Sequence, residues 1–455
     1  MSDTLNVLEP ATEQVLQSLE RADVAVVDAA VAKAKAAWPA WATVSPADRA
    51  KLLRQIVSVM EEHHEELAVL EARNAGKPLG AARGEIGMAI ETFRYMSGAP
   101  ERPHGETIPV AGGMAFTVRE PMGVVGLITP WNFPLAIACW KMAPALAAGN
   151  TVVLKPAELT PLTAVRFGEL VLEAGLPEGV VNVIVGPGRT CGTRLVEHPD
   201  VAKIAFTGST EVGASIAQGA AATIKRVTLE LGGKSANIVF ADADIEAAAT
   251  AAPWAVFDNA GQDCCARAKI LVQREAVDDF LAAMKPVVEG ITVGDPLADG
   301  TEMGPLISAA QRETVGAFVD GEAEIAIQGS TPDGPGFWFP PTVLYPAPAD
   351  HPAVHDEIFG PVAVIVPFDD EADAIRLAND TIYGLSGSIW TGNGARALRV
   401  ARAVQAGNLS VNSNSSVRVT TPFGGFKQSG YGRELGPHAT DAYTEVKTVF
   451  IATGA

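Results

Sequence analysis

The most constraining feature of this chain is a regular alternation of strand-like and helical segments between residues 123 and 241. Five short apolar runs rich in β-branched residues are predicted to be strands: Val124–Ile128, Thr151–Leu154, Val181–Val185, Ile204–Thr207 and Ala236–Phe240. Helical segments separate them at Pro161–Ala174, Gly188–Glu197 and Glu211–Ala222. This alternation predicts a doubly wound parallel sheet, which binds its ligand at the carboxyl ends of the strands.

A looser alternation between about residues 245 and 425 predicts a second α/β domain. Its strand-like segments are Ile270–Val272, Thr342–Leu344, Val362–Pro367 and Ser386–Thr391. Its helical segments are Glu275–Met284, Glu371–Asn379 and Ala395–Val404. A length of 455 residues fits two or more domains, because single hydrophobic cores usually stop growing at smaller sizes.

The first hundred residues are predicted to be helical, with segments at Val24–Trp38, from Ser45-Pro46 through Leu70, and at Ala81–Met96. Gly112-Gly113 then separates two strand-like runs, Thr107–Val110 and Met114–Arg119, and predicts a hairpin. The tail Ala442–Ile451 has the composition of a strand but no obvious local partner. The hairpin and the tail together suggest strand donation between subunits.

The composition narrows the choice of partners and compartment. With 34 basic and 53 acidic residues the formal net charge is −19, so nucleic acid and anionic membranes are unexpected partners. The four cysteines do not have the spacing of a disulfide framework, and we see neither a signal peptide nor an apolar segment of membrane length. We therefore expect a soluble cytoplasmic protein.

Two short motifs carry the sharpest chemical signal. Cys264 follows a Gly-containing turn, residues 259–263, where a thiol of lowered pKa could act as a nucleophile. Glu230 stands in an apolar run before Gly232 and Gly233, so burial would raise its pKa toward that of a general base. Each has an ordinary alternative when taken alone. Free cysteines are usually small buried hydrophobes, and the glutamate could be a surface-strand or helix-terminus acid.

Three further motifs follow predicted strands, at the sheet edge where α/β proteins bind ligands. Asn132, in the segment 129–134, could donate its amide to a developing oxyanion or could be a simple turn residue. Lys155 and Glu158 offer a cation for phosphate or ribose and a carboxylate for a ribose diol. Phe206–Gly213 combines a strand, a glycine turn and a helix start, which suits a pyrophosphate, although its glycine spacing alone is a weak signal.

Together these motifs resemble the aldehyde dehydrogenase superfamily over residues 5 to 450. PWNFP, KPAE, FTGSTEVG, ELGGKS, GQDC, EIFGPV and PFGGFKQSG occur in that family's order, and the 34-residue interval between Glu230 and Cys264 is also similar. The resemblance implies a dinucleotide-binding domain (residues 1–101 and 122–232), an α/β catalytic domain (233–428) and a small β oligomerisation element (102–121 and 443–451). It further implies a homodimer or a homotetramer.

The resemblance also implies roles for individual residues. Cys264 would attack the aldehyde carbon as a thiolate, Asn132 and the Cys264 backbone N–H would hold the oxyanion, and Glu230 would activate the water that hydrolyses the thioester. The expected cofactor contacts are Thr129, Trp131, Lys155, Glu158, Gly208, Ser209, Gly232, Glu357 and Phe359. NAD is the expected cofactor and NADP the alternative, because a carboxylate near the 2′-oxygen, here Glu158, would repel a 2′-phosphate. The presence of Glu230 favours hydrolysis over acyl transfer to coenzyme A.

In the substrate tunnel the resemblance places Phe133, Ile137, Trp140, Asp258, Asp263, Cys265 and the loop Asn414–Val419, which includes Val417 and Arg418. Carboxylates beside aromatic rings suit a cationic aldehyde, and GQDC is similar to bacterial aminoaldehyde dehydrogenases, so 4-aminobutyraldehyde is the leading candidate. Arg418 could also hold the carboxylate of a γ-glutamyl derivative. Against this, Asp258 could cap a turn, Asp263 could bind backbone N–H groups, and Arg418 could be a solvated loop residue. The substrates would then be neutral aliphatic or aromatic aldehydes.

Two hypotheses come from other classes of protein. A thiol esterase could use Cys264 and Glu230, but it would not need the cofactor motifs. A non-catalytic binding protein would have no use for Cys264, Glu230 and Asn132 together. No metal site is expected, because His351 and His355 are separated by Pro352 and lack a third ligand.

Overall fold

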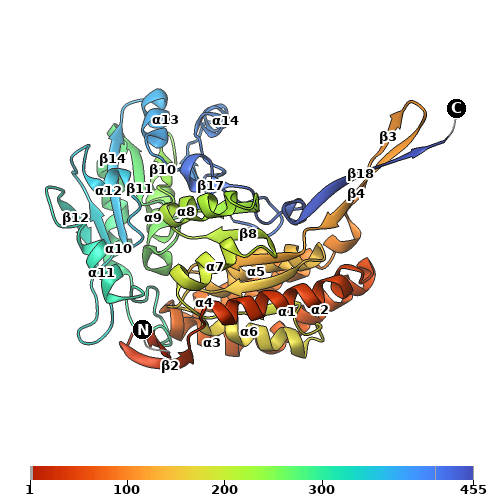
Figure 1. Ribbon diagram of the computed structural model, residues 1–455. Coiled ribbons are helices and arrows are strands. Elements are labelled where there is room, and N and C mark those ends of the chain that lie inside the picture. The colour runs from red at the N-terminus through yellow and green to blue at the C-terminus, as the bar shows by residue number, and fades with distance from the viewer. Residues whose placement is uncertain (1–3, 416, 454–455) are drawn as a thin grey trace.

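The computed structural model describes residues 4–415 and 417–453 and consists of two α/β lobes and a projecting β arm (Figure 1). The first lobe is built on a six-stranded sheet in the order β17-β9-β8-β5-β6-β7. Its strands are β5 Val124–Ile128, β6 Thr151–Lys155, β7 Val181–Val183, β8 Val201–Thr207, β9 Arg226–Glu230 and β17 Gly430–Tyr431. The described pairs are parallel except for β17, which runs antiparallel to β9.

Helices cover both faces of this sheet. Every residue of β5 and β6 is buried, as expected for strands between two helical layers. Successive residues of β5 enter different cores: Val125 and Leu127 pack with α2 to α6, whereas Val124 and Ile128 pack with α1, α7 and α8. The helices are α1 Val24–Ala42, α2 Pro46–Glu62, α3 His64–Ala75, α4 Leu79–Met96, α5 Pro134–Ala147, α6 Leu162–Glu173, α7 Thr193–Glu197 and α8 Thr210–Ala221.

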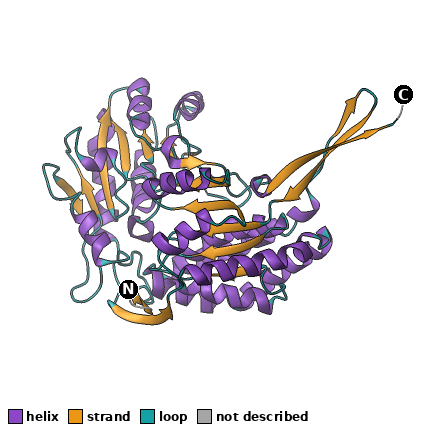
Figure 2. Cartoon of the chain, viewed as in Figure 1, coloured by secondary structure: helices purple, strands orange, loops and turns teal. Residues whose placement is uncertain are grey.

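The second lobe contains a seven-stranded sheet in the order β12-β13-β14-β11-β10-β15-β16 (Figure 2). Its strands are β10 Ala236–Val239, β11 Lys269–Gln273, β12 Ile325–Gln328, β13 Thr342–Leu344, β14 Val362–Phe368, β15 Ser386–Trp390 and β16 Asn408–Val411. Its helices are α9 Ile245–Val256, α10 Val277–Gly290, α11 Ala309–Gly316, α12 Pro352–His355, α13 Glu371–Asn379 and α14 Gly394–Ala403. One apolar cluster packs this sheet against α9 and α10, and another packs it against α13 and α14.

Sheet membership differs from the prediction at one strand. The alternation placed β10 with the first sheet, but it lies in the second, between β11 and β15. The fifth parallel strand of the first sheet is β9, which carries Glu230 at its carboxyl end. A strand's own residues do not determine which sheet it joins, because that depends on the path of the crossover before it. The alternation therefore predicted correctly that Ala236–Phe240 contains a strand, but it placed this strand in the wrong sheet.

The N-terminal segment is a β-hairpin, not a helix. Strand β1 (Thr4–Glu9) pairs antiparallel with β2 (Gln14–Glu20). Leu5 and Val7 are buried and their neighbours in the strand are not, and this period of two is the signal of a strand.

The long second helix of the prediction is divided into two helices, α2 and α3. The division falls at His63, whose φ of −100° and ψ of 14° leave the helical path.

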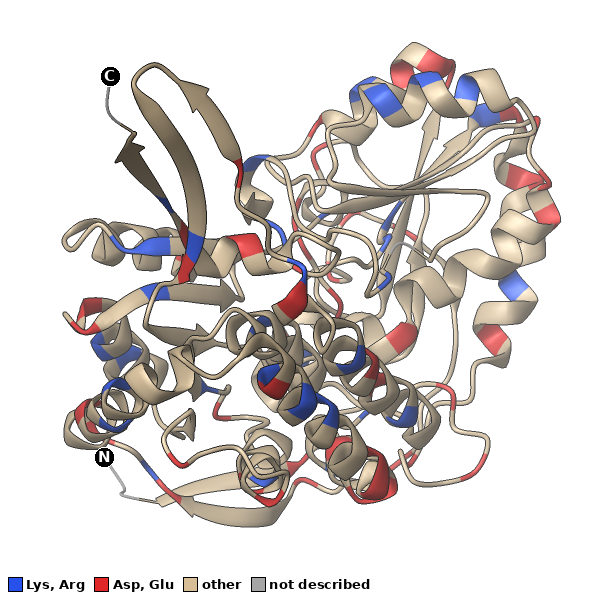
Figure 3. Ribbon diagram, turned by 90° about the vertical axis from the view of Figure 1, so that its right-hand side faces the viewer, with Lys and Arg blue, Asp and Glu red and all other residues tan. Residues whose placement is uncertain are grey.

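A three-stranded antiparallel sheet projects from the first lobe as an arm (Figure 1). Its strands, in the order β18-β4-β3, are β3 Thr107–Val110, β4 Gly113–Pro121 and β18 Thr444–Ala452. The predicted hairpin is present, and the tail strand finds its partner, β4, within the same chain. The outer part of the arm carries no Lys, Arg, Asp or Glu among its described residues (Figure 3), and it exposes Ile108, Val110 and Phe450.

Shorter helical segments complete the chain: η1 Ala99–Glu101, η2 Gly188–Gly192, η3 Asp258–Gly261, η4 Arg274–Ala276, η5 Lys427–Ser429 and η6 Ala439–Tyr443. All four cysteines are described, and none is in a disulfide. Across the described ranges, no helix has both the length and the apolar character needed to cross a membrane.

Candidate active site

A cleft of about 980 Å³ is lined by residues of both lobes, at the carboxyl ends of β5, β6 and β8. Of the residues predicted to contact the cofactor, Thr129, Trp131, Lys155, Gly208, Ser209, Gly232, Glu357 and Phe359 line it. Asn132 and Cys264 line the same cleft. Glu158 does not line it but follows the lining residue Ala157 directly. The cofactor motifs therefore converge on one ligand site, as the parallel sheet predicts.

One end of the cleft is suited to a phosphate group. Ser209 caps α8, with its hydroxyl accepting a hydrogen bond from the backbone N–H of Val212 at 3.3 Å. The other backbone N–H groups of that first turn, and the positive end of the helix dipole, favour an anion there. Lys155 adds a buried cation. Burial lowers the pKa of its ammonium group, and the charge of the neighbouring Glu158 opposes this shift only in part.

Residues 259–263, called here the nucleophile loop after the predicted role of Cys264, form a strained turn beside the cleft. Asn259, Ala260 and Gly261 have φ values of 51°, 54° and 70°, three successive left-handed residues. A Cβ atom on Gly261 would lie 2.0 Å from the carbonyl oxygen of Gly360, so only glycine fits there. This contact fixes the loop beside Phe359, and Cys264 follows it half-buried.

Hydrogen bonds join the nucleophile loop to the loop after β5. The side-chain amide of Asn132 donates to the carbonyl oxygen of Gln262 at 2.9 Å. In return, the side-chain amide of Asn259 donates to the carbonyl oxygen of Asn132 at 3.1 Å. An amide donor is thus held next to the segment that carries Cys264, where an oxyanion formed at that thiol could accept its hydrogen bond.

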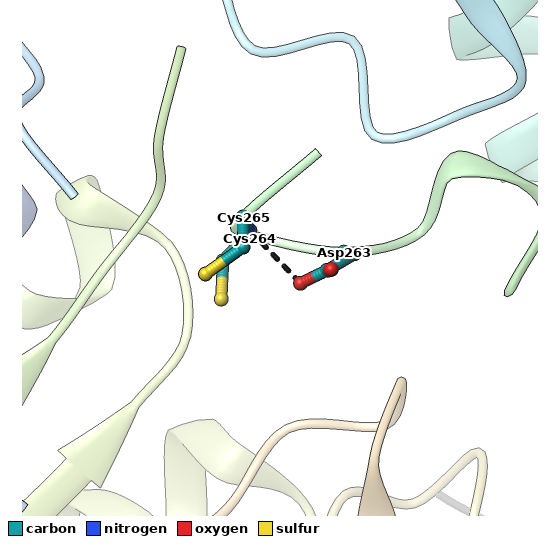
Figure 4. Close-up of side chains that lie close together, drawn as sticks. All are labelled: Asp263, Cys264 and Cys265. Carbon is teal, nitrogen blue, oxygen red and sulfur yellow. Dashed lines mark hydrogen bonds between the residues drawn. The ribbon is translucent and has the colours of Figure 1, made fainter. Parts of the chain in front are cut away.

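Asp263, Cys264 and Cys265 lie together at the tip of this loop (Figure 4). One oxygen of Asp263 accepts the backbone N–H of Cys265 at 2.8 Å, and the carboxylate also interacts with the Cys264 thiol, which lowers the pKa of Asp263 that burial raises. A hydrogen bond with the Cys265 thiol and burial raise the pKa of Cys264 well above its usual value. Asp263 thus binds a backbone N–H group, the second of its two predicted roles. The three ligand atoms lie within 4.8 Å of one another, but we assign no metal to a carboxylate used in this way.

Glu230 is buried at the carboxyl end of β9 and is not among the described residues that line the cleft. Neither of its carboxylate oxygens has a hydrogen-bond partner among the described residues, and one lies against Gly424. Burial raises the pKa of Glu230 well above its usual value, and the nearby Glu434 raises it further. Such a carboxyl group is a candidate general base, as the sequence predicts.

Two charged residues near Glu230 were missed in the sequence analysis. Lys141 on α5 is fully buried and forms an ion pair with Glu434, which is also buried. Lys141 stands in an otherwise apolar helix, and a lone charge in such a helix signals a buried partner. The identity of that partner, 293 residues away, could not be read from the sequence.

Glu357 is held against the glycine pair that follows Glu230. The backbone N–H of Gly233 donates to Glu357 at 2.9 Å, and burial raises the pKa of Glu357 to about 7. Trp131 and Phe359 meet edge to face across the cleft, with ring centroids 5.1 Å apart. These contacts order the cleft wall nearest to Cys264.

The residues predicted for the substrate tunnel mostly come together. Trp140 and Cys265 belong to one apolar cluster with Ile137, and Phe133, Cys264 and Val417 pack against it. Arg418 is exposed and donates to the carbonyl oxygen of Ser415 in its own loop, as a solvated loop residue does. Ser416, within the predicted tunnel loop, lies outside the described residues.

Asp258 lies near a small group of charged residues around Phe133. One oxygen of Asp258 accepts the backbone N–H of Asn259 at 3.0 Å, which is the predicted turn cap. Lys77 stacks over the Phe133 ring at 4.5 Å, donates to the carbonyl oxygen of Asn132 and forms an ion pair with Glu85. Asp258 is exposed, yet desolvation by the surrounding protein raises the pKa of its carboxyl group. The positive charge of Lys77 acts in the opposite direction and lowers that pKa, but by less.

These features define a class of enzyme: a half-buried thiol, an amide donor, a buried cation and a helix N-terminus meet at one cleft, and a buried carboxyl group lies within electrostatic range of Cys265. That combination belongs to dehydrogenases that work through a covalent bond to cysteine. Residues 1–449 match the sequence model of the Aldehyde dehydrogenase family, and the chain belongs to this family.

Individual relatives agree in fold and differ in the aldehyde that they are named for. Betaine aldehyde dehydrogenase 1 of Rhizobium meliloti (strain 1021) is 43% identical over 98% of this chain and 93% of its own length. Phenylacetaldehyde dehydrogenase of Pseudomonas fluorescens is 43% identical over 99% of this chain and 93% of its own. The NAD complex of aldehyde dehydrogenase from Bacillus cereus is 42% identical, with a TM-score of 0.97, and the match covers 99% of this chain and 93% of that one. The predicted family and fold class are confirmed.

Proposed function

We propose that this enzyme oxidises aldehydes to carboxylic acids with NAD as the electron acceptor, through a thioester on Cys264. The observation that carries the proposal is the position of Cys264 at the cleft, with the Asn132 amide bonded to the same loop. The cleft also fits a dinucleotide, because it has the volume of a large ligand site, a buried cation and a helix N-terminus. Thr129, Trp131, Lys155, Ser209, Glu357 and Phe359 would hold the cofactor.

Acylation depends on groups at the nucleophile loop. Cys264 gives up its proton, and its sulfur bonds to the aldehyde carbon while negative charge moves to the carbonyl oxygen. The amide of Asn132 and the backbone N–H of Cys264 are the donors that stabilise this charge. When bound, NAD supplies the acceptor for the two electrons that the substrate carbon loses.

Glu230 is the base proposed for thioester hydrolysis. Its raised pKa lets it take a proton from water, whose oxygen then bonds to the thioester carbon as the carbon–sulfur bond breaks. The acid leaves and the thiol is restored. Lys141, paired with Glu434, favours the charged form of Glu230 across the same pocket and so keeps it usable as a base.

For the substrate we propose an aminoaldehyde such as 4-aminobutyraldehyde. Glu85 forms an ion pair with Lys77, which lies over the Phe133 ring, and Asp258 adds the charge of a second carboxylate near that cation. A terminal ammonium group would meet that charge and the aromatic faces of Phe133 and Trp140. A γ-glutamyl derivative is less well supported, because Arg418 bonds its own loop.

Neutral aldehydes are the second candidate, and a specific observation favours them. The walls around Cys264 are largely apolar, and Asp263 is occupied by the Cys265 N–H. The overall identity does not decide between the candidates, since the relatives named for a cationic and for a neutral aldehyde are equally similar, at 43%.

Initial NADH formation with 4-aminobutyraldehyde and with butyraldehyde tests the substrate. We expect kcat/KM to favour the amino compound by about tenfold or more, equivalent to about 1.4 kcal/mol. Asp258→Asn should remove most of that preference, while Asp320→Asn, which neutralises an exposed carboxylate elsewhere, should not. Equal loss for both aldehydes would refute charge recognition by Asp258.

Cys264→Ala tests the chemistry itself. The variant should bind NAD but form no NADH and hydrolyse no ester. Undiminished turnover would show that another residue is the nucleophile. Ester hydrolysis by the unaltered enzyme without any NADH from a broad aldehyde panel would favour a thiol esterase instead.

A further inference from the structure

The acylation proposed above needs a group that takes the proton of the Cys264 thiol, and the carboxylate of Asp263 is placed to do so. The carboxylate and both cysteine thiols lie together where the nucleophile loop ends (Figure 4). A carboxylate oxygen of Asp263 lies within 4.8 Å of Cys264 Sγ, and a hydrogen bond with that thiol lowers the pKa of Asp263. A carboxylate this close to a reacting thiol is a candidate general base.

Hydrogen bonds on both sides of Asp263 fix its carboxylate in this place. Its side-chain oxygen Oδ1 accepts the backbone N–H of Cys265 at 2.8 Å, and its carbonyl oxygen accepts the backbone N–H of Ala266 at 3.0 Å. A carboxylate oxygen has more than one lone pair, so the bond from Cys265 leaves capacity to accept a proton. The side chain is also half-buried, and the carboxylate therefore stays beside the thiol.

Arg267, three residues after Cys264, brings a buried positive charge to this turn. Its Nη1 atom donates to the carbonyl oxygen of Cys265 at 2.7 Å, and its Nε atom donates to the hydroxyl of Ser388 on β15 at 3.2 Å. The charge of Arg267 lowers the pKa of Asp263. Arg267 thus joins the turn to the second sheet and favours the ionised carboxylate that a base requires.

The carboxyl and thiol groups around the turn determine where the proton rests before the reaction. Burial is the largest influence on the pKa of Asp263 and raises it, and the charge of Asp258 acts in the same direction. The hydrogen bond with Cys265, burial and the charges of Asp263 and Glu357 raise the pKa of Cys264 well above its usual value. The thiol therefore keeps its proton at neutral pH, and an acceptor must be present when the sulfur reacts.

Two buried lysines act on the outer carboxylates of this group. The charge of Lys77 lowers the pKa of Asp258, and that of Lys234 lowers the pKa of Glu357. The basic residue that acts on Asp263 itself is Arg267. Loss of the charge of Arg267 should therefore be felt at Asp263.

We propose that Asp263 is the general base of acylation, which accepts the proton of Cys264 as the sulfur bonds to the aldehyde carbon, and that Arg267 positions it. This inference rests on the proposed function. The S–H bond breaks as the carbon–sulfur bond forms, the proton goes to Asp263, and the π electrons of the carbonyl group move to its oxygen. In hydrolysis the carbon–sulfur bond breaks with its electron pair on sulfur, which takes that proton back from Asp263. Glu230 releases to solvent the proton that it took from water.

Two rates at Cys264 test the proposal when they are compared at pH 7. The first is single-turnover NADH formation with butyraldehyde, a neutral substrate for which a lost carboxylate cannot act through charge recognition. The second is alkylation of Cys264 by iodoacetamide without NAD, which reports how accessible and how ionised the thiol is. Asp263→Asn should slow the first rate by about a hundredfold. It should not slow the second, which should rise because the charge of Asp263 holds the pKa of the thiol up.

Matched variants guard against a folding defect and against a general effect of charge. Asp263→Glu keeps a carboxylate and should hold the first turnover within about tenfold of the wild-type rate. Asp320→Asn neutralises an exposed carboxylate elsewhere and should change neither rate.

The pH dependence of the first turnover tests the role of Arg267. Without the charge of Arg267 the pKa of Asp263 would be higher, so the base would be protonated, and the rate lost, at a higher pH. Arg267→Gln should therefore move the acidic side of the profile up by about half a unit or more, whereas Arg267→Lys should leave it within about 0.2 unit. A fall in rate at every pH without any such shift would mean that Arg267 only supports the fold.

The outcomes separate this proposal from the proposed function. If Asp263→Asn slows alkylation as much as the first turnover, Asp263 only shapes the loop, and the proposal is wrong. It is also wrong if the first turnover is unchanged in Asp263→Asn, or if Glu230→Gln slows it instead. In each of these cases the dehydrogenase function stands. If the wild-type enzyme is alkylated at Cys264 but forms no NADH from a broad aldehyde panel, the proposed function fails, and this proposal fails with it.

Discussion

Cys264 and Glu230 both hold their protons more firmly than free side chains do. The hydrogen bond with Cys265 and burial raise the pKa of the thiol, while burial and Glu434 raise that of the carboxyl group. In the proposed mechanism each residue acts in its deprotonated form, as nucleophile or as base. Both shifts therefore have the same sign, and activity should rise as pH increases from neutral into the alkaline range.

Cys265→Ala should make Cys264 more reactive near neutral pH, because the Cys265 thiol is the largest cause of its raised pKa. A fall of half a unit would raise the thiolate fraction about threefold below the pKa. The measurement is the rate at which iodoacetamide modifies the peptide containing Cys264, followed by mass spectrometry from pH 6 to 10. Identical pH profiles with and without Cys265 would contradict this account.

Glu230→Gln should slow thioester hydrolysis by about a hundredfold or more and leave the first turnover within about threefold of the wild-type rate. Stopped-flow detection of NADH should then show a burst of one equivalent per active site followed by a slow phase. The reason is that glutamine cannot take the proton from water but leaves the nucleophile loop intact. A first turnover slowed as much as the steady state would place Glu230 in acylation.

At this scale the sequence indicates candidate reactive groups but not the contacts that surround their side chains. Cys264, Glu230 and Asn132 follow from motifs, because their neighbours are local in the chain. The Cys265 N–H that occupies Asp263 and the Arg21 that pairs with Glu158 do not follow from local patterns. Such contacts depend on loop conformation or on segments far apart in sequence.

Among the elements, the turn before Cys264 shows how backbone geometry positions the proposed nucleophile. Gly261→Ala should lower the thermal midpoint by about 2–5 °C, because a methyl group would meet the Gly360 carbonyl and the φ of 70° would be strained. It should also slow turnover by displacing Cys264. Differential scanning fluorimetry and steady-state kinetics measure the two effects.

Ala260→Gly is the matched control for that change, since it alters the adjacent left-handed residue by removing a methyl group. The relief of strain and the loss of a buried methyl oppose each other, so stability should stay within about 1 kcal/mol of the wild-type value. If both variants behaved alike, the close approach to Gly360 would not be what constrains the loop.

The strands of both sheets were largely predictable, because parallel strands buried on both faces are continuous apolar runs. Strand β9 was not predicted. It begins with the charged residue Arg226 and ends at Glu230, just before the glycine pair, so it contains no continuous apolar run. The N-terminal hairpin was missed for a related reason: only Leu5 and Val7 mark the buried face of β1. Short or half-exposed strands leave too few apolar positions to define a period.

For the whole molecule, the uncharged outer part of the arm predicts assembly. Ile108, Ala115 and Phe450 lie side by side across its three strands, and Ile108 and Phe450 are exposed. An exposed apolar sheet of this kind is typical of a subunit interface. Phe450→Asp combined with Ile108→Asp should reduce the mass found by light scattering to that of one chain, from the dimer or tetramer that we predict.

Val15→Asp provides the comparison, because Val15 on β2 is exposed to a similar degree, at 52% against 54% for Phe450, but lies outside the arm. This variant should keep the wild-type mass. A wild-type protein that is itself monomeric would contradict the predicted assembly.

The short strand β17 makes the surroundings of Glu230 depend on a segment far along the chain. It pairs Gly430 with Glu230 and Tyr431 with Leu229, so the edge of β9 is covered by residues made 200 positions later. Glu434, which shapes the pKa of Glu230, follows directly. During synthesis the first lobe emerges from the ribosome long before this segment, leaving β9 as an open edge. A nascent chain can therefore assemble most of its cofactor cleft before it acquires the residues that complete the surroundings of Glu230, the proposed base.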